Sequence, residues 1–448
     1  MTAPGPLRIG GGSAFFNDRL DAALELVEHG HIDVLMIEAM AERTLAMLQA
    51  ARGAGQPGYF PRLPDRLAVL LPACRCHGTR LVSNAGGADP MAAAEAARRV
   101  ASEAGLRGVV VAAVLGDDVT AVVQASNPVL VETGEPLSRL PGPMVSANAY
   151  LGAAPIAEAC RAGAHVVLTG RVTDSALALG PLQAHYGWPA DALNALACGV
   201  AAGHLLECGG QATGGYFADP GVKDVPGLDR LGFPIAEVSK DLVIRISKPP
   251  GTGGRVDRHV ITEQLLYEVH DPARYITPDV VLDLTGVTLT QDGPEEVRLS
   301  GMRGHAPPPT LKVLIGVGDG QHVEAEISYA GPGAEGRARL AADVVQRRLA
   351  RTALRDVPVR YDLMGLNALA LPGRGPGQAL QEVRLRVAAR CPSVALAEHL
   401  VTEVESLYVN GPAGGGGVRF SIRSAVRTLT TFLPAADVAA RVEYLEVR

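Results

Sequence analysis

The stretch Ala164-His-Val-Val-Leu-Thr-Gly-Arg171-Val-Thr-Asp174-Ser175 shows the unit from which the first part of this sequence is built. An apolar run of strand length ends in a polar turn that contains glycine, and a helical pattern precedes it over residues 155–162. The same alternation runs through the first 175 residues, with apolar strands predicted at residues 7–9, 33–37, 80–82 and 108–115. It predicts an α/β fold in which helices cover both faces of a parallel sheet.

A polar or glycine-rich turn follows each of these predicted strands. Parallel strands place their carboxyl ends at one edge of a sheet, and ligands of open α/β sheets bind at that edge. The turns lie at Gly10–Ser13, Glu38, Asn84–Asp89, Asp117 and Arg171–Asp174. From them we expect ligand contacts by Gly11, Gly12, Ser13, Glu38 and Asn84. A plain tight turn at residues 10–13 and an ion pair between Glu38 and Arg43 are the alternatives without a ligand.

The pattern changes after Pro307-Pro-Pro-Thr310. A hairpin is predicted over residues 312–329 around Gly318-Asp-Gly320, followed by helices at 336–350 and 395–408 with strands between and after them. This order predicts a smaller α+β domain, for which a ferredoxin-like arrangement is one candidate. We therefore expect an α/β domain over residues 1–300 that contains the active-site cleft, and an α+β domain over residues 301–448.

The composition limits the classes of protein to which this chain can belong. Its 448 residues are 47% hydrophobic and 20% charged, which is enough for a large buried core. The formal net charge of −6 disfavours general binding to nucleic acid or to an anionic membrane, and no apolar run reaches the ~20 residues of a membrane span. The six cysteines lie mostly in apolar surroundings and no secretory leader precedes Leu7, so we expect a reduced, cytoplasmic protein.

No metal site is expected. Cys74-Arg-Cys76-His77 has residue types that bind metals, but the spacing of its cysteines is unusual and no second pair follows. His204 and Glu207 alone provide too few ligands, and no further ligand stands at a standard spacing from them.

Acid–base candidates follow a predicted helix of small and apolar side chains over residues 190–206. His204 stands three residues before Glu207 and four before Cys208, so the three side chains share one rim of the helix. The loop Gly209–Gly215 adjoins them. A histidine at such a position is either catalytic or a satisfied core residue. Cys208 is either a nucleophile or a thiol whose weak S–H bond is accepted by His204 in a packed core.

Lys248-Pro-Pro-Gly251-Thr-Gly253-Gly254 is a second candidate binding loop. Backbone N–H groups of a glycine-rich loop can surround a phosphate or carboxylate while the lysine supplies charge. Gly251, Gly253 and Gly254 are then ligand contacts together with Lys248, whereas a plain turn is the alternative. Because the lysine precedes the glycines, this is not a Walker loop.

Five motifs in fixed order resemble the acyclic terpene utilisation protein family (AtuA-like), and the resemblance spans nearly the whole chain. They are Asn148-Ala-Tyr-Leu-Gly, Thr169-Gly-Arg-Val-Thr-Asp-Ser-Ala, Gly203-His-Leu-Leu-Glu-Cys-Gly, Lys248-Pro-Pro-Gly-Thr-Gly-Gly and Asn410-Gly-Pro-Ala-Gly-Gly-Gly-Gly. The resemblance implies a role in bacterial catabolism of acyclic terpenes and related branched acids, which proceeds through acyl-CoA thioesters. It also implies a small ferredoxin-like partner, here expected as a separate subunit.

These observations favour a lyase or hydratase that acts on a branched carboxylate or an acyl-CoA thioester. Arg171 or Lys248 would bind a carboxylate or phosphate, and Glu207 or Asp174 would move a proton beside the carbonyl. His204 would act as an acid or orient its partner, and the N–H groups of residues 209–210 would stabilise an enolate oxygen. Coenzyme A is expected only as part of the substrate, and the protein as a homo-oligomer.

Two other functions remain open from the sequence. An oxidoreductase could bind a nucleotide at Gly10–Ser13, although the glycine pattern of a dinucleotide site is incomplete there. A non-catalytic scaffold subunit could instead bind a small ferredoxin-like partner through its C-terminal domain.

Overall fold

The computed structural model describes residues 4–140, 142–366 and 381–448. The chain divides into two compact units. The larger unit consists of Met1–Leu140, Val145–Ile315 and Thr428–Arg448, and the smaller of Pro141–Met144 and Gly316–Arg427. The C-terminal segment thus returns to the larger unit, because β18 (Arg441–Glu446) pairs with β4 (Val110–Leu115). A single boundary at residue 300 does not describe this division, because residues 428–448 belong to the larger unit.

The larger unit is built on a ten-stranded sheet with the order β11-β12-β8-β7-β1-β2-β3-β6-β4-β18. The strands from β1 to β4 in this order are parallel to their neighbours: β1 (Leu7–Gly11), β2 (Val34–Ile37), β3 (Arg80–Ser83), β6 (Val166–Thr169) and β4. The other strands add antiparallel edges: β7 (Ile235–Val238), β8 (Ile244–Ser247), β11 (Thr288–Gly293) and β12 (Glu296–Ser300) beside β1, and β18 beside β4. The predicted parallel layer is therefore present as the centre of a mixed sheet.

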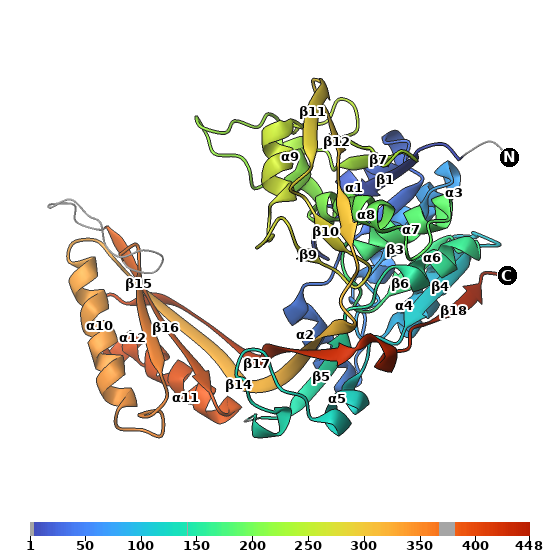
Figure 1. Cartoon of the computed structure of the whole chain (residues 1–448). Helices are drawn as coiled ribbons and strands as arrows, with labels where there is room; N and C mark the ends of the chain where they lie inside the picture. The colour runs from blue at the N-terminus through green and yellow to red at the C-terminus, as the bar shows by residue number, and fades with distance from the viewer. Residues whose placement is uncertain (1–3, 141, 367–380) are drawn as a thin grey trace. The chain divides into compact units, whose positions relative to one another are not determined.

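Both faces of the parallel strands are buried, as their continuous apolar runs predicted. In β2, Val34 and Met36 join one core while Leu35 and Ile37 join the other, which is the period of two of a strand. One face is covered by α1 (Leu20–His29), α2 (Glu42–Gly53), α3 (Leu63–His77) and α4 (Pro90–Glu103). The opposite face is covered by α6 (Ala154–Arg161), α7 (Ala176–Tyr186) and α8 (Leu193–Glu207), as Figure 1 shows.

Helix α8 is buried on all sides from Ala195 to Leu206, which explains its lack of polar residues. It lies between the large sheet and a further layer made of α9 (Arg258–Leu265) and a small sheet of β9 (Tyr275–Ile276), β10 (Val281–Asp283) and β13 (Arg303–His305). A side chain at Gly203 would meet the Ser175 carbonyl oxygen at 2.5 Å, so glycine permits the close packing of α8 on the start of α7. This core presents the polar end of α8 at the edge of the sheet.

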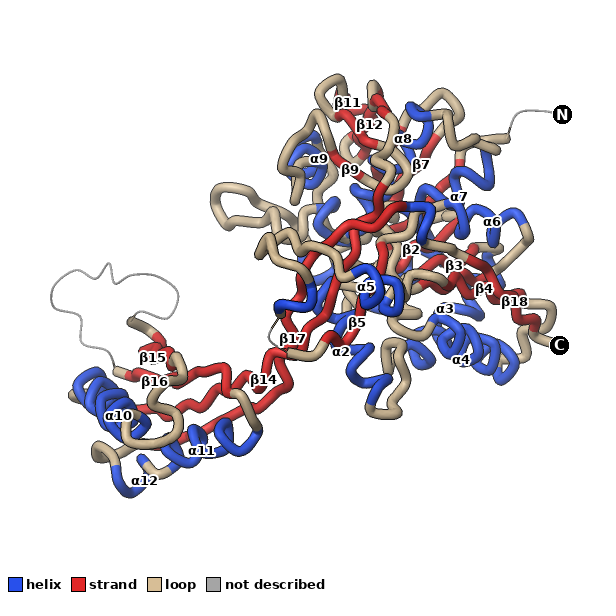
Figure 2. Tube along the Cα trace, turned by 60° about the horizontal axis from the view of Figure 1, so that its bottom comes forward, coloured by secondary structure: helices blue, strands red, loops and turns tan. Residues whose placement is uncertain are grey.

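Along the chain, the elements of the smaller unit follow the order β-α-β-β-α-β. Across its sheet, the strands lie side by side in the order β15-β16-β14-β17. Its elements are α10 (Ala334–Leu349), β15 (Val359–Met364), β16 (Glu382–Cys391), α11 (Val394–Glu405) and α12 (Leu407–Asn410). It also contains β14 (Thr310–Ala330) from Gly316 onward and β17 (Gly416–Pro434) up to Arg427, while the remainder of these two strands belongs to the larger unit. Figure 2 shows α10 and α11 on one face of this sheet, where they share a core with β14, β15 and β16. The strand pairs β14–β16 and β15–β16 are antiparallel, so the C-terminal part of the chain contains an antiparallel sheet.

The hairpin predicted around Gly318-Asp-Gly320 is wrong, because β14 is one continuous strand. Residues 321–330 pair with β16 along their length, so the long-range partner decides the conformation and not the local turn residues. Gly320 has a φ of 75° and lies so close to the Cys391 carbonyl oxygen that a side chain would clash with it. The strand β5 (Met144–Ala149) also pairs with β14, and α5 (Thr120–Ser126) precedes it. Within the described ranges, no helix is long and apolar enough to span a membrane.

Candidate functional site

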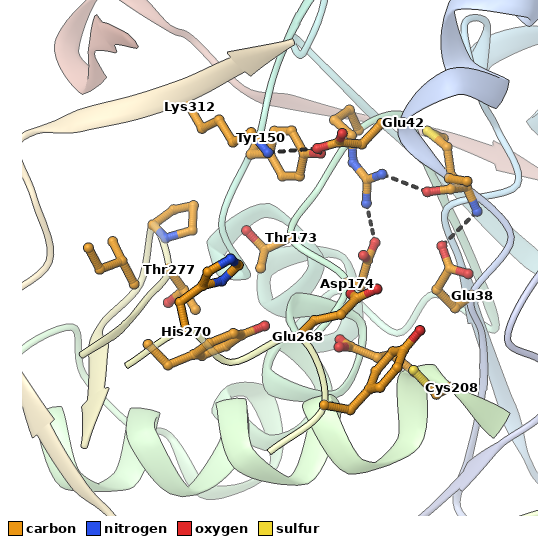
Figure 3. Close-up of a pocket in the computed structure, with 18 of the residues that line it drawn as sticks. Glu38, Glu42, Tyr150, Thr173, Asp174, Cys208, Glu268, His270, Thr277 and Lys312 are labelled. Carbon is orange, nitrogen blue, oxygen red and sulfur yellow. Dashed lines mark hydrogen bonds and ion pairs between the residues drawn. The ribbon is translucent and has the colours of Figure 1, made fainter. Parts of the chain in front are cut away.

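A cavity of about 950 Å³ lies in the larger unit, at the carboxyl ends of the central parallel strands. Glu38 borders it directly behind β2, and Arg171, Thr173 and Asp174 border it behind β6. The end of α8, the segment after α9 and the start of β14 complete the wall. Figure 3 shows side chains from these segments around one space. The sheet edge that the sequence predicted as the binding edge therefore opens onto a cavity.

Glu38 and Asn84 are joined at the back of this cavity. The side-chain amide of Asn84 donates to Glu38 Oε1 at 3.0 Å, and its oxygen accepts the Ala39 N–H at 2.7 Å. Glu38 Oε1 also accepts the Met40 N–H at 2.6 Å. Burial, together with the nearby Asp174 carboxylate, raises the pKa of Glu38 to about 8. Glu38 is thus a cavity carboxyl group that retains its proton at neutral pH.

Asp174 lies beside Glu38 and is held from two sides. Asn84 donates to its Oδ1 at 3.3 Å, and the guanidinium of Arg171 donates to the same oxygen. Its side chain is 34% exposed, whereas that of Arg171 is 1% exposed. Burial raises the pKa of Asp174 while the charge of Arg171 acts against that change. The site therefore brings together Glu38, Asn84, Asp174 and Arg171, which the sequence placed behind three different strands.

Arg171 is not available to bind a substrate carboxylate in the way the sequence suggested. Its Nη1 donates to the Met40 carbonyl at 2.7 Å, and its Nε and Nη2 donate to the Val172 carbonyl. The guanidinium also stacks on the Tyr150 ring, 4.7 Å from the ring centre. With Asp174 as a further acceptor, most of its donors are used within the protein. Arg171 is better described as the buried charge that holds Asp174 in place.

The turn before Arg171 is fixed by Asp117. The Oδ2 atom of Asp117 accepts the Arg171 N–H and the Asn148 side-chain amide, both at 2.9 Å. A side chain at Gly170 would lie within 2.6 Å of this carboxyl group, so position 170 accepts only glycine. Burial raises the pKa of Asp117 to about 6. The Thr-Gly-Arg turn thus owes its geometry to a carboxylate from the end of a neighbouring strand.

His204 and Glu207 form a pair at the end of α8, as their spacing predicted. His204 Nδ1 lies 2.9 Å from Glu207 Oε1, and its Nε2 lies 3.2 Å from the Leu265 carbonyl oxygen. Because that carbonyl can only accept, Nε2 carries a proton, and Nδ1 and Glu207 share a second one. Although burial acts to lower it, the Glu207 carboxylate raises the pKa of His204. Glu207 borders the cavity, whereas His204 is buried behind it and does not.

Cys208 borders the cavity as a thiol. Burial, reinforced by the charge of Glu207, raises the pKa of Cys208 to about 12. A thiolate is the nucleophilic form of cysteine, so this environment disfavours Cys208 as a covalent nucleophile. The neighbouring glycines 209 and 210 are buried in the 3-10 turn that ends α8.

The glycines that follow β1 serve packing rather than an open loop. A side chain at Gly11 would meet the Leu206 carbonyl oxygen at 2.5 Å, and one at Gly12 would meet the Ile37 side chain at 2.6 Å. Ser13 is buried and donates its hydroxyl to the Glu38 carbonyl oxygen. None of the three borders the cavity. They bring the ends of α8 and β2 together, and no feature of this turn supports the nucleotide site considered from the sequence.

The Lys248 loop also lies outside the cavity wall. The Lys248 ammonium donates to the Thr252 carbonyl at 2.8 Å and pairs with Glu295 at 2.8 Å, and the side chain is almost fully buried. Gly253 and Gly254 approach the backbone of Gly227 and Thr213 too closely for a side chain, while Gly251 has a φ of 77°. The expectation of an anion loop is corrected here: the loop closes on itself and supports the turn behind α8.

Several cavity residues were not predicted from the sequence. Lys312 Nζ lies 2.6 Å from Glu42 Oε1, the Tyr150 hydroxyl donates to the same oxygen at 2.6 Å, and Lys312 stands 4.9 Å from the centre of the Tyr150 ring. Although burial opposes it, hydrogen bonds from Lys312 and Tyr150 lower the pKa of Glu42. Glu268, His270 and Tyr275 also border the cavity. The sequence signals that could have identified them are Glu268 and His270, which follow helix α9, and Lys312, which lies near the start of β14.

The side chains of the Cys74–His77 motif do not converge. It lies in the last turn of α3, where Cys74 is buried and Cys76 is exposed, so the two thiols face different surroundings. Across the described ranges, no group of three or more histidine, cysteine, aspartate or glutamate side chains is arranged to hold a metal ion.

Comparison with known proteins gives one result. Neither a curated protein nor a solved structure shows significant similarity to this sequence. Residues 7–444, nearly the whole chain, match the family described as "Acyclic terpene utilisation family protein AtuA". The match covers the sheet, both units and every cavity residue discussed above. The chain therefore belongs to the acyclic terpene utilisation family AtuA.

Proposed function

We propose that this chain is a catabolic enzyme that moves a proton beside a carbonyl group in a lyase or hydratase reaction. The observation that supports this is a pair of cavity carboxyl groups in different surroundings. Burial raises the pKa of both groups, to about 8 for Glu38, whereas at Glu207 the charge and hydrogen bond of buried His204 oppose that rise. Environments that separate the protonation of two carboxyl groups assign one as a base and the other as an acid.

Glu207 is the proposed base. Its carboxylate takes the proton from the carbon beside the carbonyl. His204 behind it is hydrogen-bonded to Glu207 and stabilises the negative charge of the carboxylate before the proton is transferred. The imidazole is fixed by the Leu265 carbonyl at one nitrogen, so only the nitrogen facing Glu207 exchanges a proton. His204 is therefore a positioning residue, while Glu207 contacts the substrate.

Glu38 is the proposed acid. In the elimination direction the C–H electron pair forms the double bond, the adjacent C–O bond breaks, and the departing hydroxyl leaves as water with the proton of Glu38. The reverse sequence is hydration. Among the described residues only Oε1 of Glu38 accepts hydrogen bonds, which leaves Oε2 to carry the proton. Asn84 holds the Glu38 carboxyl group in position and is itself hydrogen-bonded to Asp174.

The proposed substrate is a branched carboxylate or its coenzyme A thioester. The family description names acyclic terpenes, whose breakdown gives branched chains. Part of the cavity wall is apolar and suits such a chain, with contributions from Met40, Tyr275, Ile276, Pro278 and Phe432. Coenzyme A belongs to this proposal only as part of the substrate. A homo-oligomer and a small partner subunit remain predictions from the sequence.

Turnover of a panel of branched, unsaturated acids and their coenzyme A thioesters tests the proposal. Replacing Glu207 by Gln keeps the shape but removes the base, so turnover should fall by about 10²- to 10⁴-fold. Glu263→Gln is the matched control, since Glu263 pairs with Lys223 on the surface and does not border the cavity. Near-normal turnover by the Glu207 variant shows that the site is misassigned. A wild-type protein that converts no member of the panel contradicts the proposed substrate class.

A further inference from the structure

We infer that Lys312 and Arg43 form an anion-binding subsite of this cavity, separate from the proposed catalytic carboxyl groups Glu207 and Glu38. The inference rests on the proposed function and specifies its substrate: the molecule carries an oxyanion, a carboxylate or a phosphate, away from the carbon that reacts. Neither residue was a candidate from the sequence.

The two cations first considered for this role have most of their binding capacity used within the protein. Arg171 donates to the carbonyls of Met40 and Val172 and to Asp174. Lys248 is buried against Thr252 and Glu295 and lies outside the cavity wall. An oxyanion that enters the cavity must therefore find another positive partner.

Lys312, unlike Arg171 and Lys248, is a cavity cation that has donors free for a ligand. It borders the cavity, and its side chain is 40% exposed. Glu42 is its ion-pair partner, and an ammonium group has three donors, so donors remain for a ligand. The Tyr150 ring below the ammonium, together with the Glu42 carboxylate, restricts the lysine to one region of the wall. A side chain that is already ordered loses less entropy when it binds a ligand.

Arg43 adds a second positive charge to the wall of this cavity. It follows Glu42 in the first turn of α2 and borders the same cavity. Within the described ranges its side chain makes no hydrogen bond or ion pair, so its planar group of donors is free for an oxyanion. Lys312 and Arg43 together exceed the single negative charge of Glu42.

The rest of the cavity repels an anion. The carboxyl groups of Asp174, Glu207 and Glu268 border it. Figure 3 shows Lys312 and Glu42 on one side of the space, with Glu268 and Cys208 on the other. This separation of charge orients an asymmetric substrate, with its oxyanion at Lys312 and its reacting carbon near Glu207. The oxyanion is either a free carboxylate or a phosphate of coenzyme A.

Lys312→Gln tests the subsite, and the chain offers a closely matched control. Lys223 pairs with Glu263 at 2.5 Å, lies 4.5 Å from the centre of the Phe217 ring and is 41% exposed, yet it does not border the cavity. Lys223→Gln therefore removes the same kind of contacts elsewhere. Calorimetry with each variant uses three probes: coenzyme A, 3-methylbut-2-enoate and the neutral amide of that acid.

The Lys312 variant should bind one of the two anions about tenfold more weakly, as expected for the loss of a charge-assisted contact. Lys312→Arg should restore most of the affinity, and Lys223→Gln should change little. Loss with coenzyme A identifies the phosphate as the group bound, and loss with the acid identifies the carboxylate. Equal effects of the two glutamine variants, or an equal loss with the neutral amide, overturn the subsite. Glu207→Gln should still bind the same probe, which separates this test from that of the catalytic base.

Discussion

Glu38 should make the stability of this protein depend on pH, and the structure gives the size of the effect. Burial, with the charge of Asp174, raises the pKa of Glu38 from its usual 4.5 to about 8. Below the lower value the carboxyl group is protonated in both the folded and the unfolded chain. As the pH rises towards the folded value, the carboxyl group ionises first in the unfolded chain, which stabilises the unfolded state relative to the folded one. Stability is therefore full at low pH and is lost as the pH rises from the lower value to the higher one.

Glu38→Gln removes this dependence, because the amide has the shape of the protonated carboxyl group. Relative to the wild type, the variant should gain about 3 to 4 kcal/mol in free energy of unfolding between about pH 5 and about pH 8. Urea titrations of both proteins at these two pH values measure the difference. Glu28→Gln, on the exposed side of α1, controls for the loss of one carboxylate. If the stability difference between Glu38→Gln and wild type is the same at both pH values, Glu38 is not a buried carboxyl with a raised pKa.

Two further substitutions test cavity residues separately. Glu268 has a φ of 58°, which glycine adopts more readily, so Glu268→Gly should raise the free energy of unfolding by up to about 1 kcal/mol. Its turnover should fall, because the variant loses a cavity carboxylate. His31→Gly is the control: His31 has a φ of 49° and lies on the surface, so this change should leave turnover unchanged. An unchanged turnover of the Glu268 variant would show that its strained conformation serves no step of the reaction. Cys208→Ser should retain turnover within a few-fold, because burial keeps the thiol protonated. A complete loss, with the fold intact by circular dichroism, would instead support covalent catalysis.

The parts of the fold that could be predicted are those with local signals. The apolar runs of β2 and β4, each ending in a polar turn, are recognisable without any partner strand. Since parallel strands end at one edge, the same pattern also predicted that Glu38, Asn84 and Asp174 meet, and the Asn84 amide donates to both carboxyl groups. The contact of His204 with Glu207 was predictable because residues three apart lie on the same face of a helix.

The parts that could not be predicted depend on distant partners. Lys312 and Glu42 are 270 residues apart, and no local pattern links them. Lys248 resembles an anion ligand until Glu295 is seen to neutralise it. Gly320 resembles a hairpin turn, but pairing with β16 keeps β14 continuous. In each case a long-range contact decides between two locally acceptable structures, so the sequence pattern alone leaves the choice open.

Exchange of the substrate proton with solvent tests the central role of Glu207 most directly. The unsaturated or hydrated acid or thioester that the wild type converts is incubated with enzyme in deuterium oxide, and deuterium on the carbon beside the carbonyl is followed by nuclear magnetic resonance. A base that removes this proton should introduce deuterium at that carbon with the wild type and with Glu263→Gln, but not with Glu207→Gln. Incorporation at the wild-type rate by the Glu207 variant would contradict the assignment of Glu207 as the catalytic base.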